Sequence, residues 1–242
     1  MESKPLNRDI IKYIAMFTML LNHIANVFMD KTTFLAQAFI DIGYFTAITM
    51  CYFLVEGYEY THSKKKYALR LLLFAFISEF PFCLAFSPNG KFEFVALNMM
   101  FTLFICFLII CVLKNVENKA LKIILTSILT ICTFICDWAL FSAIFTILFV
   151  WAGKDKEKIN EAYAVSAMWF ILFNIMNTPN GAISVNSIIL SFGTGVGIIA
   201  SWFVITRLYN GKRAEKGRTF SKWFFYLFYP VHILILGIIK VL

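Results

Sequence analysis

A histidine stands beside two asparagines in the first long apolar stretch of the chain, residues 10–29. Asn22 and Asn26 lie one helical turn apart and His23 follows Asn22, so a helix gathers the three side chains into one polar patch. Because imidazole exchanges a proton near neutral pH, His23 predicts general acid–base chemistry. The two asparagines are equally suited to hydrogen bonds between packed helices.

Further polar side chains interrupt later apolar stretches. Ionisable groups inside membrane helices are rare and usually functional, and mutual hydrogen bonding between helices is the alternative interpretation. Counting at ~1.5 Å per residue along each expected helix places two of them near mid-membrane and the others, like His23, nearer the outer side. The first two are Glu79 and His232, and the others are Asp41, Asn98 and Asp137.

The elements that position these groups are apolar helices. The chain is 60% hydrophobic and only 15% charged, whereas soluble domains are typically about 45–50% apolar and about 25% charged. We therefore predict an all-α, polytopic integral membrane protein with a single transmembrane domain over residues 1–242. The net charge of +8 lies in short loops between apolar runs, which favours membrane topology over nucleic-acid binding.

About nine transmembrane helices are expected. The stretch 121–151 is divided into two short helices, with Asp137 and Trp138 at the turn between them. Residues 87–90 and 177–181 have the composition of turns. The other helices are predicted at 10–29, 34–58, 67–86, 94–113, 159–176, 183–205 and 223–242.

The distribution of positive charge predicts the orientation. With the N-terminus inside, 19 of the 22 Lys and Arg residues fall on the cytoplasmic side. This is the asymmetry that the positive-inside rule describes, and it also favours the division at Asp137. The C-terminus is then outside.

Neither a disulfide framework nor a metal site is indicated. The six cysteines all lie within apolar runs, without a CxxC motif and without histidine at metal-ligand spacing. Packing in the core is their expected role, and no metal is predicted.

Two basic groups are expected on the inner side, at Lys64–Lys66 with Arg70 and around residues 207–218. Topology alone accounts for such charges, but a cytosolic ligand that carries phosphates would also bind them.

Five stretches, spread over the chain in order, resemble the TraX family. They are LNRDIIKYIAMFTMLLNHIA (6–25), FLVEGYEYTHSKKKYALRLLLFAFISEFPF (53–82), LNMMFTLF (97–104), CDWALFSAIFTILF (136–149) and FYPVHILIL (228–236). The resemblance implies a polytopic protein of the bacterial cytoplasmic membrane, related to membrane acyltransferases and linked to N-terminal acetylation of pilin. This chain departs from the family pattern at Asn22 and Tyr44, where aspartate and arginine, respectively, are common in the family.

The resemblance implies acetyl transfer from acetyl-CoA to an acceptor amine or hydroxyl on a pilin, peptide or glycan. His23 would be the base, and the remaining catalytic candidates would orient it, stabilise the oxyanion or line the path. These candidates are Asn22, Asn98, Tyr229 and His232. Ligands for the CoA phosphates are expected at Lys66, Arg70, Arg207, Arg213 and Arg218, and polar groups on the substrate side at Asp41, Glu56 and Asp137.

Two other functions fit the same residues. A proton-coupled or small-solute transporter would use Asp41, Glu79, His23 and His232 as a relay, although no internal repeat supports this. A non-enzymatic membrane partner of a secretion or conjugation complex would have no single critical polar residue.

Overall fold

A computed structural model describes residues 4–88, 93–177 and 185–242 of the chain. Within these residues the protein is all-α, with nine α-helices, one 3-10 helix at Thr133–Ile135 and one π-helix at Val204–Leu208. The α-helices are α1 (Arg8–Phe28), α2 (Phe34–Tyr60), α3 (Lys64–Phe86), α4 (Met99–Asn115), α5 (Lys119–Cys132), α6 (Phe141–Ala152), α7 (Lys156–Met176), α8 (Val185–Phe203) and α9 (Arg218–Val241).

Short polar side chains begin many of these helices. The side-chain oxygen of Asn7 accepts a hydrogen bond from the Ile10 amide at 3.0 Å, and Asp155 accepts from the amides of Glu157 and Lys158 at the start of α7. Such caps satisfy amide groups that have no partner within the helix. Ser63, Asn98 and Asn118 cap α3, α4 and α5 in the same way.

Six of the described helices are long and apolar enough to span a membrane: α1, α2, α3, α7, α9 and a helical stretch from Ile188 to Leu208. The helices α4 and α6 are apolar but shorter. The division of residues 121–151 is confirmed, because α5 and α6 are separate helices of 14 and 12 residues with Asp137 in the turn between them.

Several predicted boundaries were wrong by a few residues. The basic residues Lys64–Lys66 form the first turn of α3 instead of a loop, and α9 begins at Arg218 instead of residue 223. Conversely, residues 94–98 were predicted as helix but are non-helical, and α4 begins only at Met99. The predicted turns at 87–90 and 177–181 extend into residues 89–92 and 178–184, which lie outside the described part of the chain.

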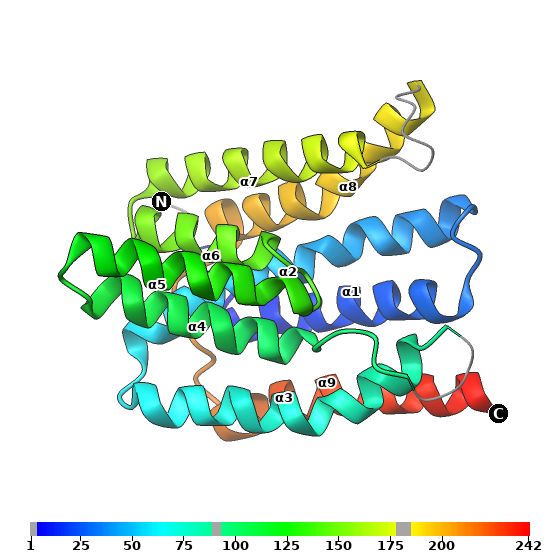
Figure 1. Ribbon diagram of the computed structural model, residues 1–242, viewed down its shortest axis with the longest axis horizontal. Coiled ribbons are helices and arrows are strands. Elements are labelled where there is room, and N and C mark those ends of the chain that lie inside the picture. Colours follow the sequence, from blue (N-terminus) through cyan, green and yellow to red (C-terminus); the bar gives the residue numbers. More distant parts are fainter. Residues whose placement is uncertain (1–3, 89–92, 178–184) are drawn as a thin grey trace. The chain divides into compact units, whose positions relative to one another are not determined.

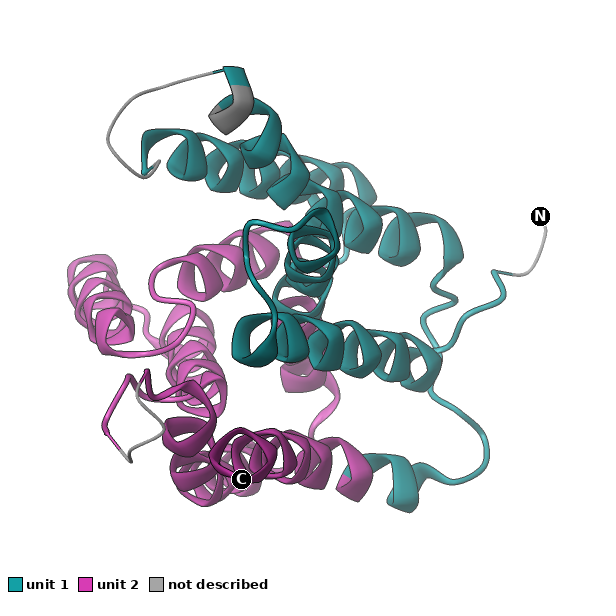
Figure 2. Cartoon of the chain, turned by 90° about the vertical axis from the view of Figure 1, so that its right-hand side faces the viewer, with its two compact units in different colours: residues 1–49, 154–222 teal, residues 50–153, 223–242 magenta. Residues whose placement is uncertain are grey.

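The chain divides into two compact units, coloured in Figure 2. Unit 1 comprises residues 1–49 and 154–222, and unit 2 comprises residues 50–153 and 223–242. Helix α2 is shared, since its first half belongs to unit 1 and its second half to unit 2. The prediction of a single domain over residues 1–242 stays a prediction.

Unit 1 is held together by hydrogen bonds between buried polar side chains. The Thr18 and Thr46 hydroxyls, 2.9 Å apart, join α1 to α2, and the Thr46 hydroxyl donates to the Ala15 carbonyl. The Ser201 hydroxyl on α8 lies 2.7 Å from that of Thr49 on α2 and 2.9 Å from that of Tyr163 on α7. Figure 1 shows α7 and α8 running side by side in opposite directions.

Unit 2 places α3 and α9 side by side and parallel. Phe74 stacks on Tyr226 with ring centroids 4.9 Å apart, and a Cβ on Gly237 would lie 3.2 Å from the Ala85 amide. At the far end Lys240 donates to the Ala85 and Ser87 carbonyls, at 2.9 and 2.6 Å. Within each unit these relative directions are those of helices that cross a membrane alternately, whereas the orientation with the N-terminus inside stays a prediction.

Candidate functional site: a polar cluster at the start of α4

Two stretches of non-helical backbone meet in unit 2, beside helices that continue past them. Leu97 forms an isolated parallel bridge with Cys136: its amide donates to the Ile135 carbonyl at 2.9 Å, and its carbonyl accepts from the Asp137 amide at 2.6 Å. The neighbouring α3 and α9 are candidate membrane spans. At membrane depth, such backbone is tolerated where protein buries it or where it lines a polar cavity. This junction is therefore the first candidate site.

Asn98 and Glu79 form the core of this site. Asn98 is fully buried at the cap of α4, where its side-chain oxygen accepts from the Met100 amide at 2.9 Å. Its Nδ2 donates to Glu79 Oε2 at 2.6 Å and to the Ala75 carbonyl at 2.8 Å, and its backbone amide also donates to Glu79 Oε2 at 3.2 Å. A carboxylate is thereby held at the positive end of the α4 dipole, where negative charge is stabilised.

Helix α9 contributes Tyr229 and His232. The Tyr229 hydroxyl oxygen accepts from the Met99 amide at 3.2 Å, so the tyrosine shares the first turn of α4 with Asn98. His232 is 6% exposed and stacks on the Phe228 ring at 4.5 Å between centroids. Its Nδ1 lies 2.6 Å from the Phe228 carbonyl, which can only accept, so Nδ1 carries the proton. In a neutral ring, Nε2 is then the proton acceptor.

The turn at residues 137–140 is strained. Trp138 and Leu140 both have positive φ, 60° and 63°, which is uncommon for residues other than glycine. The turn is fixed from both sides, because the Thr102 hydroxyl donates to the Asp137 carbonyl at 2.5 Å and the Leu140 amide donates to the Thr133 hydroxyl at 3.0 Å. Each such residue costs about 1–3 kcal/mol and persists only where its surroundings hold it.

Unit 1 contains the polar patch of α1. His23 is 8% exposed and therefore buried. Asn22 donates through Nδ2 to the Ile40 carbonyl of α2 at 3.0 Å, while Asn26 donates to the side-chain oxygen of Asn22 at 3.0 Å. A Cβ on Gly43 would overlap the Asn22 side chain, so the glycine makes room for this contact. The two asparagines thus join α1 to α2 immediately beside His23.

Asp41 lies in the same unit, against the glycines of α8. A Cβ on Gly193 would come within 2.6 Å of Asp41 Oδ2, and one on Gly197 within 2.5 Å of the Asp41 carbonyl. The other carboxylate oxygen, Oδ1, is buried and forms no hydrogen bond with the described residues. An acidic residue of α2 therefore packs against Gly193 and Gly197 of α8.

The N-terminal segment of unit 1 lies along residues 206–214. Leu6 forms a parallel bridge with Tyr209, the Arg8 amide donates to the Lys212 carbonyl at 2.9 Å, and Asp9 accepts from the Ala214 amide at 2.7 Å. Lys4 donates to the Thr206 carbonyl at 2.6 Å.

Positive charges gather around this segment. Burial lowers the pKa of Lys4, and the neighbouring positive charges of Lys156 and Arg207 lower it further. The side chains of Arg207, Arg213 and Arg218 are exposed, and Arg218 Nε donates to the Ala214 carbonyl at 2.8 Å. An anion would relieve the mutual repulsion of these cations.

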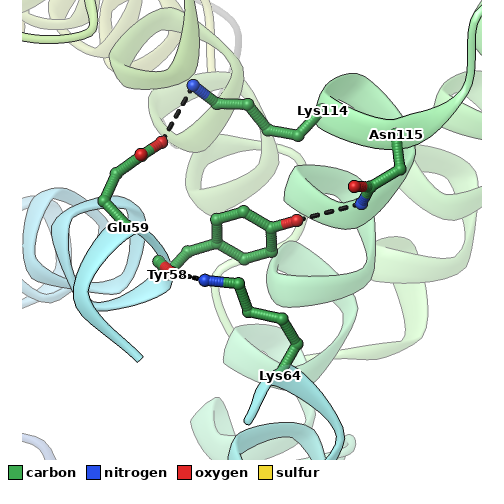
Figure 3. A network of polar contacts seen from close by, with 5 residues as sticks. All are labelled: Tyr58, Glu59, Lys64, Lys114 and Asn115. Carbon is green, nitrogen blue, oxygen red and sulfur yellow. Dashed lines mark hydrogen bonds and ion pairs between the residues drawn. The ribbon is translucent and has the colours of Figure 1, made fainter. Parts of the chain in front are cut away.

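Polar side chains from the start of α3 and the end of α4 contact the end of α2 (Figure 3). Lys64 donates to the Tyr58 carbonyl and, at 3.1 Å, to the Thr61 carbonyl, so it caps the end of α2. Lys114 pairs with Glu59 at 2.9 Å, and Asn115 donates to the Tyr58 hydroxyl at 2.9 Å.

Other predicted ligands of unit 2 lie outside this network. The Lys66 side chain is exposed. Arg70 is half-buried and lies further along α3, between Lys66 and Glu79. Glu56 is half-buried in the second half of α2.

The structure therefore brings together only some of the predicted site residues. Asn98 and Tyr229 meet at the start of α4, and the backbone of Asp137 completes that junction. The patch of Asn22 and His23 belongs to unit 1, and unit 1 also contains Asp41 and the arginines at 207, 213 and 218.

The sequence analysis did not predict two features of this site. Glu79 was recognised as a charge near mid-membrane but not as the partner of Asn98, and the strained turn was expected to be an ordinary one. The pairing of Glu79 with Asn98 had an available signal in the sequence: an acidic residue within an apolar helix, followed in the next segment by an asparagine that can cap a helix. Among the described residues, no group of three or more His, Cys, Asp or Glu side chains is placed to hold a metal ion.

The fold and the buried polar groups define a multi-pass membrane protein with polar sites inside its helices. A sequence profile described as "TraX protein" matches residues 7–240, so the chain belongs to the TraX family. It is similar to "Probable fimbrial assembly protein FimC, serogroup H1" of Dichelobacter nodosus, with 29% identity over 233 residues, which cover 93% of this chain and 92% of that protein. No solved structure matches the chain.

Proposed function

We propose that the protein is a membrane-embedded acetyltransferase of the bacterial cytoplasmic membrane. It would move acetyl from cytosolic acetyl-CoA to an amine or hydroxyl of an acceptor in or beyond the membrane, of the pilin, peptide or glycan class. The observation that carries the proposal is membership of the TraX family over nearly the whole chain. Similarity over comparable lengths to a protein named for fimbrial assembly supports an acceptor connected with surface appendages.

The chemistry needs a base and donors for an oxyanion. The acceptor nitrogen or oxygen attacks the thioester carbonyl, the base removes its proton, and the C–S bond then breaks to release CoA as a thiolate that takes up a proton. We assign the base to His23, which is buried beside the Asn22 amide. His232, whose Nδ1–H is already donated to a carbonyl, is the second candidate.

Tyr229 and Asn98 suit the positioning of the thioester. They hold the start of α4 in a fixed geometry, and a preorganised amide and hydroxyl cost little rearrangement during reaction. The CoA phosphates would be bound by the basic residues Lys66, Arg70, Arg207, Arg213 and Arg218. Asp41, Glu56 and Asp137 are proposed on the path of the acceptor.

The test uses the full chain in lipid nanodiscs with radiolabelled acetyl-CoA. Envelope fractions from a strain that lacks the gene supply acceptors, and label transfer is measured with and without the protein. The proposal expects protein-dependent labelling of an envelope component and saturable binding of acetyl-CoA. Binding without transfer to any envelope component contradicts acetyl transfer, and the absence of binding at low salt favours transport or a non-enzymatic role in assembly.

A further inference from the structure

Arg70 is a positive charge within a candidate membrane span that lacks a counterion. Its side chain is half-buried, and its Nε is completely buried and forms no hydrogen bond. Within the described part of the chain, no carboxylate forms an ion pair with Arg70. A partly buried cation without a counterion is costly, so native structures often pair it with a carboxylate or bind an anion to it.

The surroundings of Arg70 are aromatic. Tyr67 precedes it by one helical turn, with the guanidinium carbon 5.6 Å from the ring centroid, and Phe74 follows it by one turn. Phe74 stacks on Tyr226 of α9, whose hydroxyl interacts with the guanidinium. Aromatic rings and one hydroxyl compensate a cation only partly, with about 0.5–2 kcal/mol for each cation–π contact.

Extension of the side chain to water is the alternative explanation of an arginine near a helix end. Arg70 is six residues from Lys64, so its Cα lies about 9 Å along α3 from the start of the helix, within reach of the membrane surface. Extension toward water would still leave Nε without a partner, because this atom is buried and forms no hydrogen bond. Lys64, at the start of the same helix, instead donates to carbonyls at the end of α2.

We infer that Arg70, flanked by Tyr67 and Tyr226, is the anchor of a phosphate-binding site in unit 2. The planar guanidinium offers a fork of N–H groups that matches a phosphate, and the half-buried side chain leaves part of that fork accessible. The phosphate would belong either to a free ligand such as CoA or to a lipid headgroup. Only the free-ligand source rests on the proposed acetyltransferase function.

The experiment measures phosphate binding to the full chain in an uncharged detergent, by isothermal titration. The probes are CoA, inorganic pyrophosphate and a short-chain phosphatidylglycerol. Arg70→Gln removes the guanidinium but keeps a polar side chain, and Arg70→Lys keeps the charge without the fork. Lys119→Gln is the control, because Lys119 is an exposed lysine at the start of α5 in the same unit as Arg70, and it belongs to neither predicted phosphate-binding group.

Arg70→Gln is expected to lower the affinity for at least one probe by about tenfold or more, and Arg70→Lys should lower it by less. Lys119→Gln should change affinity no more than about twofold, as is usual for a screened surface charge. Loss confined to CoA and pyrophosphate identifies a free ligand, and loss confined to phosphatidylglycerol identifies a lipid headgroup. A folded Arg70→Gln protein that binds all three probes like the wild type overturns the site.

Thermal unfolding in the same detergent shows whether each variant is folded. If Arg70→Gln does not fold, Tyr226→Phe tests the same site by removing only a hydroxyl, and unchanged affinity for every probe in that variant counts against the site. Acetyl transfer measured on the same preparations separates the two proposals. Phosphate binding at Arg70 without acetyl transfer contradicts only the proposed acetyltransferase function. Acetyl transfer together with an undiminished affinity of Arg70→Gln for CoA contradicts only the assignment of CoA to Arg70.

Discussion

His23 is the residue on which the proposed chemistry depends most. It is buried in α1, and the neighbouring polar side chains are the amides of Asn22 and Asn26, which hydrogen-bond to each other and to α2. A carboxamide side chain does not take up a proton near neutral pH, so within this patch only the imidazole can act as a base. The two asparagines thus have the structural role in this patch, and His23 has the proposed chemical role.

We predict that His23→Ala lowers the rate of acetyl transfer by at least about 100-fold, since removal of a positioned base typically costs 10²–10⁴-fold. Affinity for acetyl-CoA and expression should change little. The measurement is label transfer to the envelope acceptor at saturating acetyl-CoA. His62→Ala is the control, because the His62 side chain is exposed between α2 and α3. A near wild-type rate in His23→Ala would move the role of base to His232.

At the scale of elements, the start of α4 depends on one carboxylate. Glu79 Oε2 accepts two hydrogen bonds from Asn98, one from the side chain and one from the backbone. The position of α4 relative to α3 is therefore sensitive to this residue.

Glu79→Ala should lower the melting temperature in detergent by several degrees, because it leaves buried donors of Asn98 without acceptors at about 1–3 kcal/mol each. Glu79→Gln should cost less, since its amide oxygen still accepts one of the bonds. Glu117→Ala is the control, as Glu117 is exposed between α4 and α5. Equal melting temperatures for Glu79→Ala and Glu117→Ala would show that the network contributes little to stability.

The elements also show where the sequence was informative. Helix number and the division at Asp137 could be predicted, because apolar runs and polar connections follow each other regularly along the chain. The starts of α3 and α9 were predicted too late, since long basic side chains are compatible with the first turn of a helix that reaches the membrane surface.

The delayed start of α4 could not be read locally. Residues 94–98 are mostly apolar, and they are non-helical where the Leu97 backbone pairs with residues 135–137, far along the chain. The contact between Asn98 and Glu79 depends on the same arrangement. Such pairings are set by tertiary packing, whereas hydropathy and periodicity report only on neighbouring residues.

For the whole molecule, the charge distribution predicts which side of the membrane each loop faces. The alternating helix directions within each unit suit a membrane protein, and the excess of basic residues favours an N-terminus inside. We predict that reporter fusions after Lys65 and Lys216 report the cytoplasm and that a fusion after Asn180 reports the outside. Alkaline phosphatase and green fluorescent protein fusions at the same positions check one another. Reversal at any of the three positions would contradict the topology.

The pairing of the N-terminal segment with residues 206–214 also bears on biosynthesis. Lys4 and Thr206 are 202 residues apart in sequence, so during translation the segment around Lys4 waits until its partners at residues 206–214 have been made. At about 5–20 residues per second, this delay is on the order of 10–40 s. During that time residues 50–153, which belong to unit 2, are synthesised in full. Unit 1 is therefore completed only after all of unit 2 up to residue 153 has been made and residues 206–214 have followed.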